Sequence, residues 1–130
     1  MKKLLLTIGL IVMIYGFSNA QTSDELYRAF DGKGKSVDLK TILAAAVKAD
    51  VVFLGETHDD SVAHAIQYEV FKGVFEKVGK SRKTKLSLEM FARDVQTIVD
   101  EYLGGMITEK HFLASSRPWG NYKTDYRPLV

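Results

Sequence analysis

The sequence contains no cysteine, only two prolines, and only a small excess of positive charge. Because disulfides are excluded, an ordinary hydrophobic core must hold the folded part together. The 18 basic and 16 acidic residues nearly cancel, so no nucleic-acid partner is indicated. The longest apolar run, residues 4–17, is too short to predict a transmembrane helix. A chain of 130 residues has room for one domain at most.

Residues 1–20 have the order of a secretory signal peptide. Lys2 and Lys3 precede the apolar run, and Ser18 and Ala20 are the small residues that a signal peptidase requires. We therefore predict cleavage after Ala20 and a periplasmic or secreted protein, with no cysteine at the boundary for lipid attachment. Removing the two lysines leaves 18 − 2 = 16 basic against 16 acidic residues, so the mature chain is formally neutral.

From residue 21 to residue 130, the pattern predicts a single α/β domain. Residues 26–30 and 36–37 flank an Asp-Gly turn and are expected to form an N-terminal β-hairpin. Helices are expected over residues 39–48 and 61–78, where apolar residues recur at helical spacing. Two continuous apolar stretches, residues 51–54 and 86–90, are typical of central strands in a parallel sheet.

A strand, a helix and a second strand in that order predict a right-handed βαβ unit, and hence a partial parallel sheet flanked by helices. Ligands bind beyond the carboxyl ends of the strands in such sheets. The first predicted strand runs directly into the sequence GETHDD at residues 55–60, and the second ends beside Glu89. Both acidic groups are therefore expected at the same edge of the sheet, where a ligand would bind.

Four short motifs carry a resemblance to a known family. They are GETH at residues 55–58, LEMF at 88–91, YLGG at 102–105 and RPWGNYKTDYRPLV at 117–130. In this order they make the chain similar to the ChaN-like haem-binding uptake family of the Tiki superfamily. The chain departs from that family in two respects, because members are often lipoproteins and continue well beyond the length of this sequence.

The resemblance implies an exported protein that binds haem for haem or iron uptake and acts by binding rather than by catalysis. It also implies outer-membrane or periplasmic iron-uptake components as partners and, as one alternative, a homodimer. Relatives in the wider superfamily, among them erythromycin esterases and Tiki-type metalloproteases, use the glutamate and histidine of the equivalent turn in a metal or hydrolytic site. A metal-dependent hydrolase, in which Glu56 acts as general base or metal ligand and His58 as metal ligand, is therefore the alternative function, and an inactive remnant is a third.

Glu56 and His58 are the strongest site candidates from the residues themselves. They alternate along the chain, so in an extended turn both side chains can point toward one ligand. Carboxylate and neutral imidazole are suitable ligands for a transition metal. The alternative is that this turn only caps the following helix, with Asp60 as its N-cap. Capping accounts for Asp60 but leaves Glu56 and His58 unexplained.

Glu89 and His64 are further cofactor-binding candidates at the same edge. Glu89 interrupts an apolar strand end, where an unpaired buried carboxylate would be costly, so it is expected to meet the ligand, solvent or a basic side chain. His64 lies near the start of the helix predicted over residues 61–78, on its apolar stripe. For His64, the alternative to ligand binding is a core histidine with both ring nitrogens satisfied.

The segment before the end of the chain offers the groups that a haem site requires, namely an axial ligand, flat apolar walls and cationic partners for the propionates. Tyr122 and Tyr126 are candidates for the axial ligand, and Trp119 for a wall. Arg117 and Arg127 are candidates for binding the propionates. The alternative is a structural loop whose aromatic side chains plug the sheet edge.

The last residues predict an incomplete, truncated domain. Pro128 stands where a first helical turn tolerates proline, so a new helix is expected to open there. Two core strands and one hairpin bury little surface, and we expect such a domain to be loosely packed by itself. The sequence also contains no nucleophile elbow and no HExxH helix, which disfavours the hydrolase.

Overall fold

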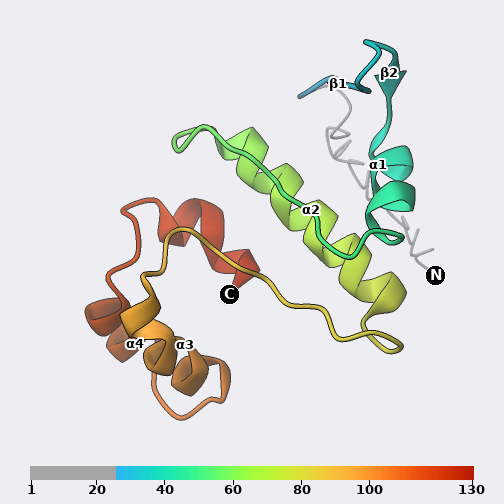
Figure 1. Ribbon diagram of the computed structural model, residues 1–130. Helices are drawn as coiled ribbons and strands as arrows, with labels where there is room; N and C mark the ends of the chain where they lie inside the picture. Colours follow the sequence, from blue (N-terminus) through green and yellow to red (C-terminus); the bar gives the residue numbers. More distant parts are fainter. Residues whose placement is uncertain (1–25) are drawn as a thin grey trace, which may run out of the picture.

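The computed structural model describes residues 26–130 (Figure 1). The predicted signal peptide, residues 1–20, lies outside the described residues. No helix within residues 26–130 combines the length and the apolar character needed to cross a bilayer. In chain order the elements are β1 (Ala29–Phe30), β2 (Ser36–Val37), α1 (Leu39–Ala46), α2 (Ser61–Val78), the 3₁₀ turn η2 (Arg93–Val95), α3 (Gln96–Leu103), α4 (Glu109–Ser116), the π turn η3 (Tyr122–Tyr126) and the 3₁₀ turn η4 (Arg127–Leu129).

The predicted N-terminal hairpin is confirmed. Strands β1 and β2 pair antiparallel as a two-stranded sheet. Between them, the Asp31 carboxylate accepts hydrogen bonds from the backbone amides of Lys33 and Lys35, both at 2.9 Å. Gly34 then adopts a φ of 78°, in the left-handed region that favours glycine. The turn therefore closes by side-chain capping and by the freedom of one glycine.

Aspartates begin the two helices that follow. Asp38 accepts a hydrogen bond from the amide of Thr41 at 2.7 Å at the start of α1. Asp60 accepts from the amides of Val62 and Ala63, at 2.9 and 3.1 Å, at the start of α2. The N-cap role predicted for Asp60 is confirmed, and α2 has the predicted bounds.

Helix α1 packs on α2 to form the first of two apolar clusters, in which Ala46, Val70 and Val74 are buried. The helices approach closely because residue 73 is glycine. A Cβ atom at that position would lie 2.8 Å from Cδ2 of Leu43, a distance that real Cβ contacts do not reach. The α1–α2 pair is therefore held by a specific close contact.

The second cluster lies in the C-terminal part of the described chain. Its buried members are Met90, Phe112, Tyr122, Tyr126 and Leu129. Phe112 is at the centre, with no exposed surface, and its ring stacks on that of Tyr102 at a centroid distance of 4.3 Å. Helices α3 and α4 and the turns η3 and η4 thus share one aromatic core.

The parallel sheet expected from residues 51–54 and 86–90 is not formed, although the mixture of helices and strands agrees with an α/β fold. Figure 1 shows both stretches as elongated coils that run along α2 in the same direction, from its C-terminal toward its N-terminal end. They follow the path of a βαβ unit, but they border a cavity and do not pair with each other. Paired strands must lie about 4.8 Å apart, and a cavity between them excludes that spacing.

Exposure also differs from the prediction. Val51 and Phe53, expected inside the sheet, are 65% and 92% exposed. Within residues 26–130, no backbone–backbone hydrogen bond involves any residue of the segments 50–56 and 83–87. An apolar strand is buried only when neighbouring strands cover its edges and helices cover both faces. In the described part of this chain, helix α2 is present beside these segments and the neighbouring strands are not.

Candidate functional site

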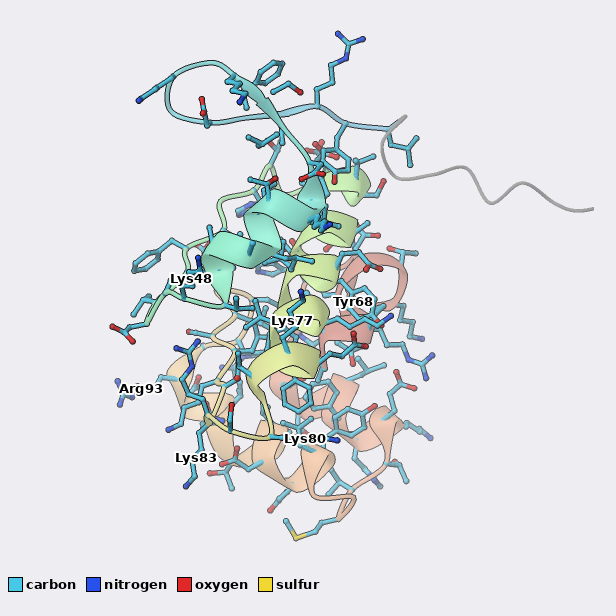
Figure 2. The ribbon with its side chains drawn as sticks, turned by 90° about the vertical axis from the view of Figure 1, so that its right-hand side faces the viewer. Lys48, Tyr68, Lys77, Lys80, Lys83 and Arg93 are labelled. Atoms are coloured by element: carbon cyan, nitrogen blue, oxygen red, sulfur yellow. The ribbon has the colours of Figure 1, made fainter. Side chains whose placement is uncertain are left out.

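A cavity of about 830 Å³ lies between α2 and the two unpaired stretches. Both stretches run in the same direction, so the residues that precede them gather at one end of the cavity and the residues that follow them at the other. These two ends differ in their chemistry. One end carries Arg82, Lys83 and Lys85; Figure 2 shows Lys83 projecting from the same side of the molecule as Lys48 and Arg93. The other end is formed by the residues that follow the two stretches and by the C-terminal segment, namely Glu56, His58, Glu89, Trp119 and Tyr126. The volume of the whole cavity is in the range of small-molecule and cofactor sites.

Glu56 is the centre of a hydrogen-bond network at the polar end. The Tyr126 hydroxyl donates to its Oε1 at 2.8 Å, and the Gln67 side-chain amide donates to its Oε2 at 2.9 Å. Burial opposes ionisation of this carboxyl group. The hydrogen bonds from Gln67 and Tyr126, together with two nearby histidines, outweigh burial and lower the pKa of Glu56 below its usual value.

His64 is fully buried beneath Glu56, and both of its ring nitrogens have partners. Nδ1 lies 2.8 Å from Oδ2 of Asp125, and Nε2 lies 2.8 Å from the Tyr126 hydroxyl. The ring thus lies between two carboxylates, with Asp125 beside Nδ1 and Glu56 Oε2 3.4 Å from Nε2.

The two tyrosines considered as axial ligands are both buried. Burial, the hydrogen bond to Glu56 and the surrounding carboxylates raise the pKa of the Tyr126 hydroxyl. Burial is also the main cause that raises the pKa of Tyr122 to about 12. Tyr126 borders the cavity but directs its hydroxyl into the network, and Tyr122 packs against Phe112 in the aromatic core. Both side chains are therefore held neutral.

His58, in contrast, is 62% exposed at the mouth of the cavity. Its ring stacks on Trp119 with centroids 4.5 Å apart, and its Nδ1 lies 3.4 Å from Oε1 of Glu56. The backbone oxygen of His58 accepts a hydrogen bond from the Asn121 side chain at 2.9 Å. Trp119 contacts Tyr126 edge-on, so the histidine sits on an aromatic wall that is itself fixed to the network.

The structure brings half of the eight predicted site residues into one network, places a fifth on the same cavity and holds the other three elsewhere. Glu56, His58, His64 and Tyr126 form one contact network, and Glu89 is exposed on the same cavity.

The two predicted arginines lie outside the lining of this cavity. Arg117 binds both carboxylate oxygens of Asp94, at 2.7 and 2.9 Å. Arg127 binds both carboxylate oxygens of Glu109, at 2.6 and 2.9 Å. Each guanidinium group is therefore neutralised by a carboxylate of the chain itself.

Three members of the network were missed by sequence reasoning, namely Gln67, Asn121 and Asp125. Gln67 follows His64 by three residues, a spacing that places both on one face of α2 and was a usable signal. The contact between His64 and Asp125 joins residues 61 positions apart, for which spacing offers no signal.

Within residues 26–130, no group of three or more histidine, aspartate, glutamate or cysteine side chains is arranged to hold a metal ion. Glu56 and His58 are adjacent there, but both oxygens of Glu56 already accept hydrogen bonds from the protein. The exposed imidazole of His58 is thus the group best placed to meet a ligand in the cavity.

Comparison with known protein families gives a match to the family described as haem-binding uptake, Tiki superfamily, ChaN. The match spans residues 42–130, which is more than half of the chain and contains the whole polar network. No curated protein and no solved structure shows significant similarity to the chain. The four motifs predicted this family, and the chain belongs to the ChaN-like haem-binding uptake family of the Tiki superfamily.

Proposed function

We propose that this protein binds haem at the polar end of the cavity, with His58 as the axial ligand. The observation that carries the proposal is the position of His58, which is exposed at the cavity mouth and stacked on Trp119. Its Nδ1 faces Glu56, so Nε2 is the ring nitrogen available to iron. Trp119, on which the imidazole stacks, holds the His58 ring in place at the mouth of the cavity.

Glu56 supports this role as the orienting group for His58. A metal-bound histidine commonly donates its second N–H group to a carboxylate, which fixes the ring and strengthens the ligand. The 3.4 Å separation between His58 Nδ1 and Glu56 Oε1 needs only a small ring movement to become a hydrogen bond. Glu56 is suited to the task because Tyr126 and Gln67 hold it in place and its lowered pKa keeps it ionised.

The buried tyrosines are weaker candidates for the axial position. Tyrosine binds haem iron as the phenolate, and the raised pKa values of Tyr122 and Tyr126 oppose that form. We likewise assign neither Arg117 nor Arg127 to the propionates, because both already bind carboxylates of the chain. In this proposal the C-terminal segment contributes the wall of the site and the groups that support it.

Family membership supports a role related to haem uptake. We propose that the protein is exported, as its N-terminal sequence predicts, and that it binds haem for transfer to iron-uptake components of the periplasm or outer membrane. Catalysis is not required for that role. The alternative, a metal-dependent hydrolase, would use Glu56 and His58 for a divalent ion in place of haem.

Haem titration tests the proposal. The purified protein should give a saturable shift of the haem Soret band with the spectrum of histidine ligation. His58→Ala should abolish that shift, whereas His111→Ala should not change it. His111 is a matched control because it is exposed on α4, where its ring contacts Thr108, and does not border the cavity.

Two results would contradict haem binding at this site. One is a saturable Soret shift of equal size in the His58→Ala variant. The other is an unchanged Soret band together with binding of zinc or another divalent ion that depends on Glu56 and His58, which would support the hydrolase instead.

A further inference from the structure

We propose that Asp125 is the positioning residue of this site and that it holds His58 by two separate routes. One route runs through Asn121 to the backbone of His58. The other runs through the buried His64 and the network around Glu56 to the His58 ring. The inference rests on the proposed function, because it takes His58 as the axial ligand, and it extends that function to a residue outside the lining of the 830 Å³ cavity.

The first route ends on the backbone of His58. The Asn121 side-chain nitrogen donates to the His58 backbone oxygen at 2.9 Å and to Oδ2 of Asp125 at 3.3 Å. Both of these oxygens can only accept, so the NH₂ end of the amide is the end that fits between them. The backbone amide of Asp125 donates to the Asn121 backbone oxygen at 3.0 Å, which brings the two side chains to one side of the π turn η3. Asn121 therefore bridges Asp125 and the turn that carries His58.

The second route ends on the ring of His58. Oδ2 of Asp125, the same atom that the amide bridge contacts, lies 2.8 Å from Nδ1 of His64. Nε2 of His64 lies 2.8 Å from the Tyr126 hydroxyl, which donates to Oε1 of Glu56. That oxygen of Glu56 is 3.4 Å from Nδ1 of His58. A single carboxylate oxygen is thus connected with His58 through the backbone and through the ring.

His58 requires both constraints because its side chain is 62% exposed. An exposed side chain samples several rotamers, and a ligand that needs one of them must exclude the rest when it binds. Stacking on Trp119 holds one face of the ring, whereas the two routes hold the backbone that carries the ring and the carboxylate beside it. Groups that support a metal ligand in this way commonly contribute a factor of about 10–100 to metal affinity.

The contacts of Asp125 favour a positioning role over one confined to the core. A carboxylate that only satisfied the buried His64 would need no second partner, yet Asp125 also contacts the amide that binds His58. Its side chain is 12% exposed, and it lines a second, smaller pocket together with His58 and Asn121. Asp125 therefore lies between the buried histidine and the exposed one.

Imidazole NMR of the haem-free protein tests the positioning directly. The ring current of Trp119 should shift the His58 ring protons upfield in the unmodified protein, because the two rings are stacked. Asp125→Ala should move these resonances toward those of a free histidine. Asp94→Ala is the matched control, since that carboxylate binds Arg117 outside the cavity lining and its removal should leave the His58 resonances in place. Unchanged His58 resonances in Asp125→Ala would overturn the proposal.

Asn121→Ala keeps the test decisive if Asp125→Ala does not fold. It cuts only the backbone route and leaves the buried His64 beside its carboxylate. The His58 resonances should move in the same direction as in Asp125→Ala, by a smaller amount. A folded Asn121→Ala variant whose His58 resonances do not move would also overturn the proposal.

Haem titration supplies a second measurement. Asp125→Ala should weaken haem binding at least about tenfold, and Asn121→Ala should weaken it by less. Because both routes pass through Asp125, the two losses should not add in the double variant. Fully additive losses would mean that the two residues act on His58 independently, which contradicts the proposal.

The two proposals fail in different ways. A Soret shift that survives His58→Ala would remove the haem ligand, while the resonances of the haem-free protein would still show whether Asp125 holds the ring. Loss of haem binding in His58→Ala, with resonances and affinity unchanged in Asp125→Ala, would remove only the positioning role.

Discussion

The two ends of the segment 50–58 differ in whether their polar groups have hydrogen-bond partners. At the far end, the side chain of Glu56 has a partner for each oxygen, supplied by α2 and by the C-terminal segment. A few residues earlier, the backbone of residues 50–54 has no hydrogen-bond partner within the described chain. The same short segment therefore contains the best connected and the least connected groups near the cavity.

This difference shows which kind of contact each region depends on. The network around His64 is closed by individual side chains, so it needs only that α2 and the π turn η3 meet. The backbone groups of a parallel sheet are paired by hydrogen bonds to neighbouring strands, and each neighbour must be present along the whole length of the strand. We expect the network around His64 to stabilise the fold and the unpaired residues 50–54 to contribute little to its stability.

His64→Ala should have the largest effect. It removes a fully buried ring and leaves Asp125, Tyr126 and Glu56 without their shared partner. Breaking a buried network of this kind costs about 3–5 kcal/mol. Urea denaturation followed by circular dichroism measures the loss, and His111→Ala serves as the exposed control. Equal stability of the two variants would show that the network contributes nothing to the fold.

Gly73→Ala should have the second largest effect. The new Cβ would lie 2.8 Å from Cδ2 of Leu43, so either the Leu43 side chain must change its rotamer or α1 must move away from α2. Overpacking of a core contact costs about 1–3 kcal/mol, and the higher helix propensity of alanine recovers at most about 1 kcal/mol. Combining the change with Leu43→Ala should restore part of the loss. Additive losses in the double variant would argue against a clash at this contact.

Acid should lower the free energy of unfolding by a smaller amount, by protonating the carboxylates of the network around His64. The pKa of Glu56 is below its usual 4.5, and that of Asp125 is below its usual 3.8 because of hydrogen bonds from Thr124 and His64. Groups with a lowered pKa in the folded state stabilise it above the unfolded pKa and lose that effect as the pH falls through the folded value. Stability should therefore fall below about pH 4.5.

Glu56→Gln provides the control for the acid prediction, because glutamine cannot titrate. Its free energy of unfolding should depend less on pH below 4.5 than that of the unmodified protein. Parallel pH profiles for the two proteins would mean that other carboxylates control acid unfolding. Thermal melts at a series of pH values make the comparison.

Phe53→Ser should have the smallest effect on stability. The ring is almost completely exposed, and substitutions of such side chains usually change stability by less than about 0.5 kcal/mol. A large loss of stability in the free protein would mean that the stretch is already packed in solution.

Local signals in the sequence predicted much of the fold. The hairpin, the bounds of α2 and the Asp60 cap all depend on residues within a few positions of one another. The alternation of Glu56 and His58 also predicted that their side chains lie together, and they do. Each of these features depends on turn chemistry or helical spacing, which a short stretch of chain determines by itself.

Contacts across long separations were not predictable in the same way. The sequence marked residues 51–54 and 86–90 as strands, but a strand needs a neighbour, and no local pattern reports whether one is present. Arg117 and Arg127 had the charge for propionates, yet Asp94 and Glu109 lie close enough to bind them. Their local sequences contain no information about these competing partners.

By itself, then, the sequence determined the hairpin, the long helix with its cap, the family and the pair of Glu56 and His58. Only the tertiary structure decided that His64 joins Asp125 and Tyr126, that the tyrosines are buried and neutral, and that His58 is exposed at the mouth of the cavity. The physical reason is that capping and helix formation require only nearby residues. The burial, hydrogen bonding and pKa of a side chain depend on distant segments that folding brings together.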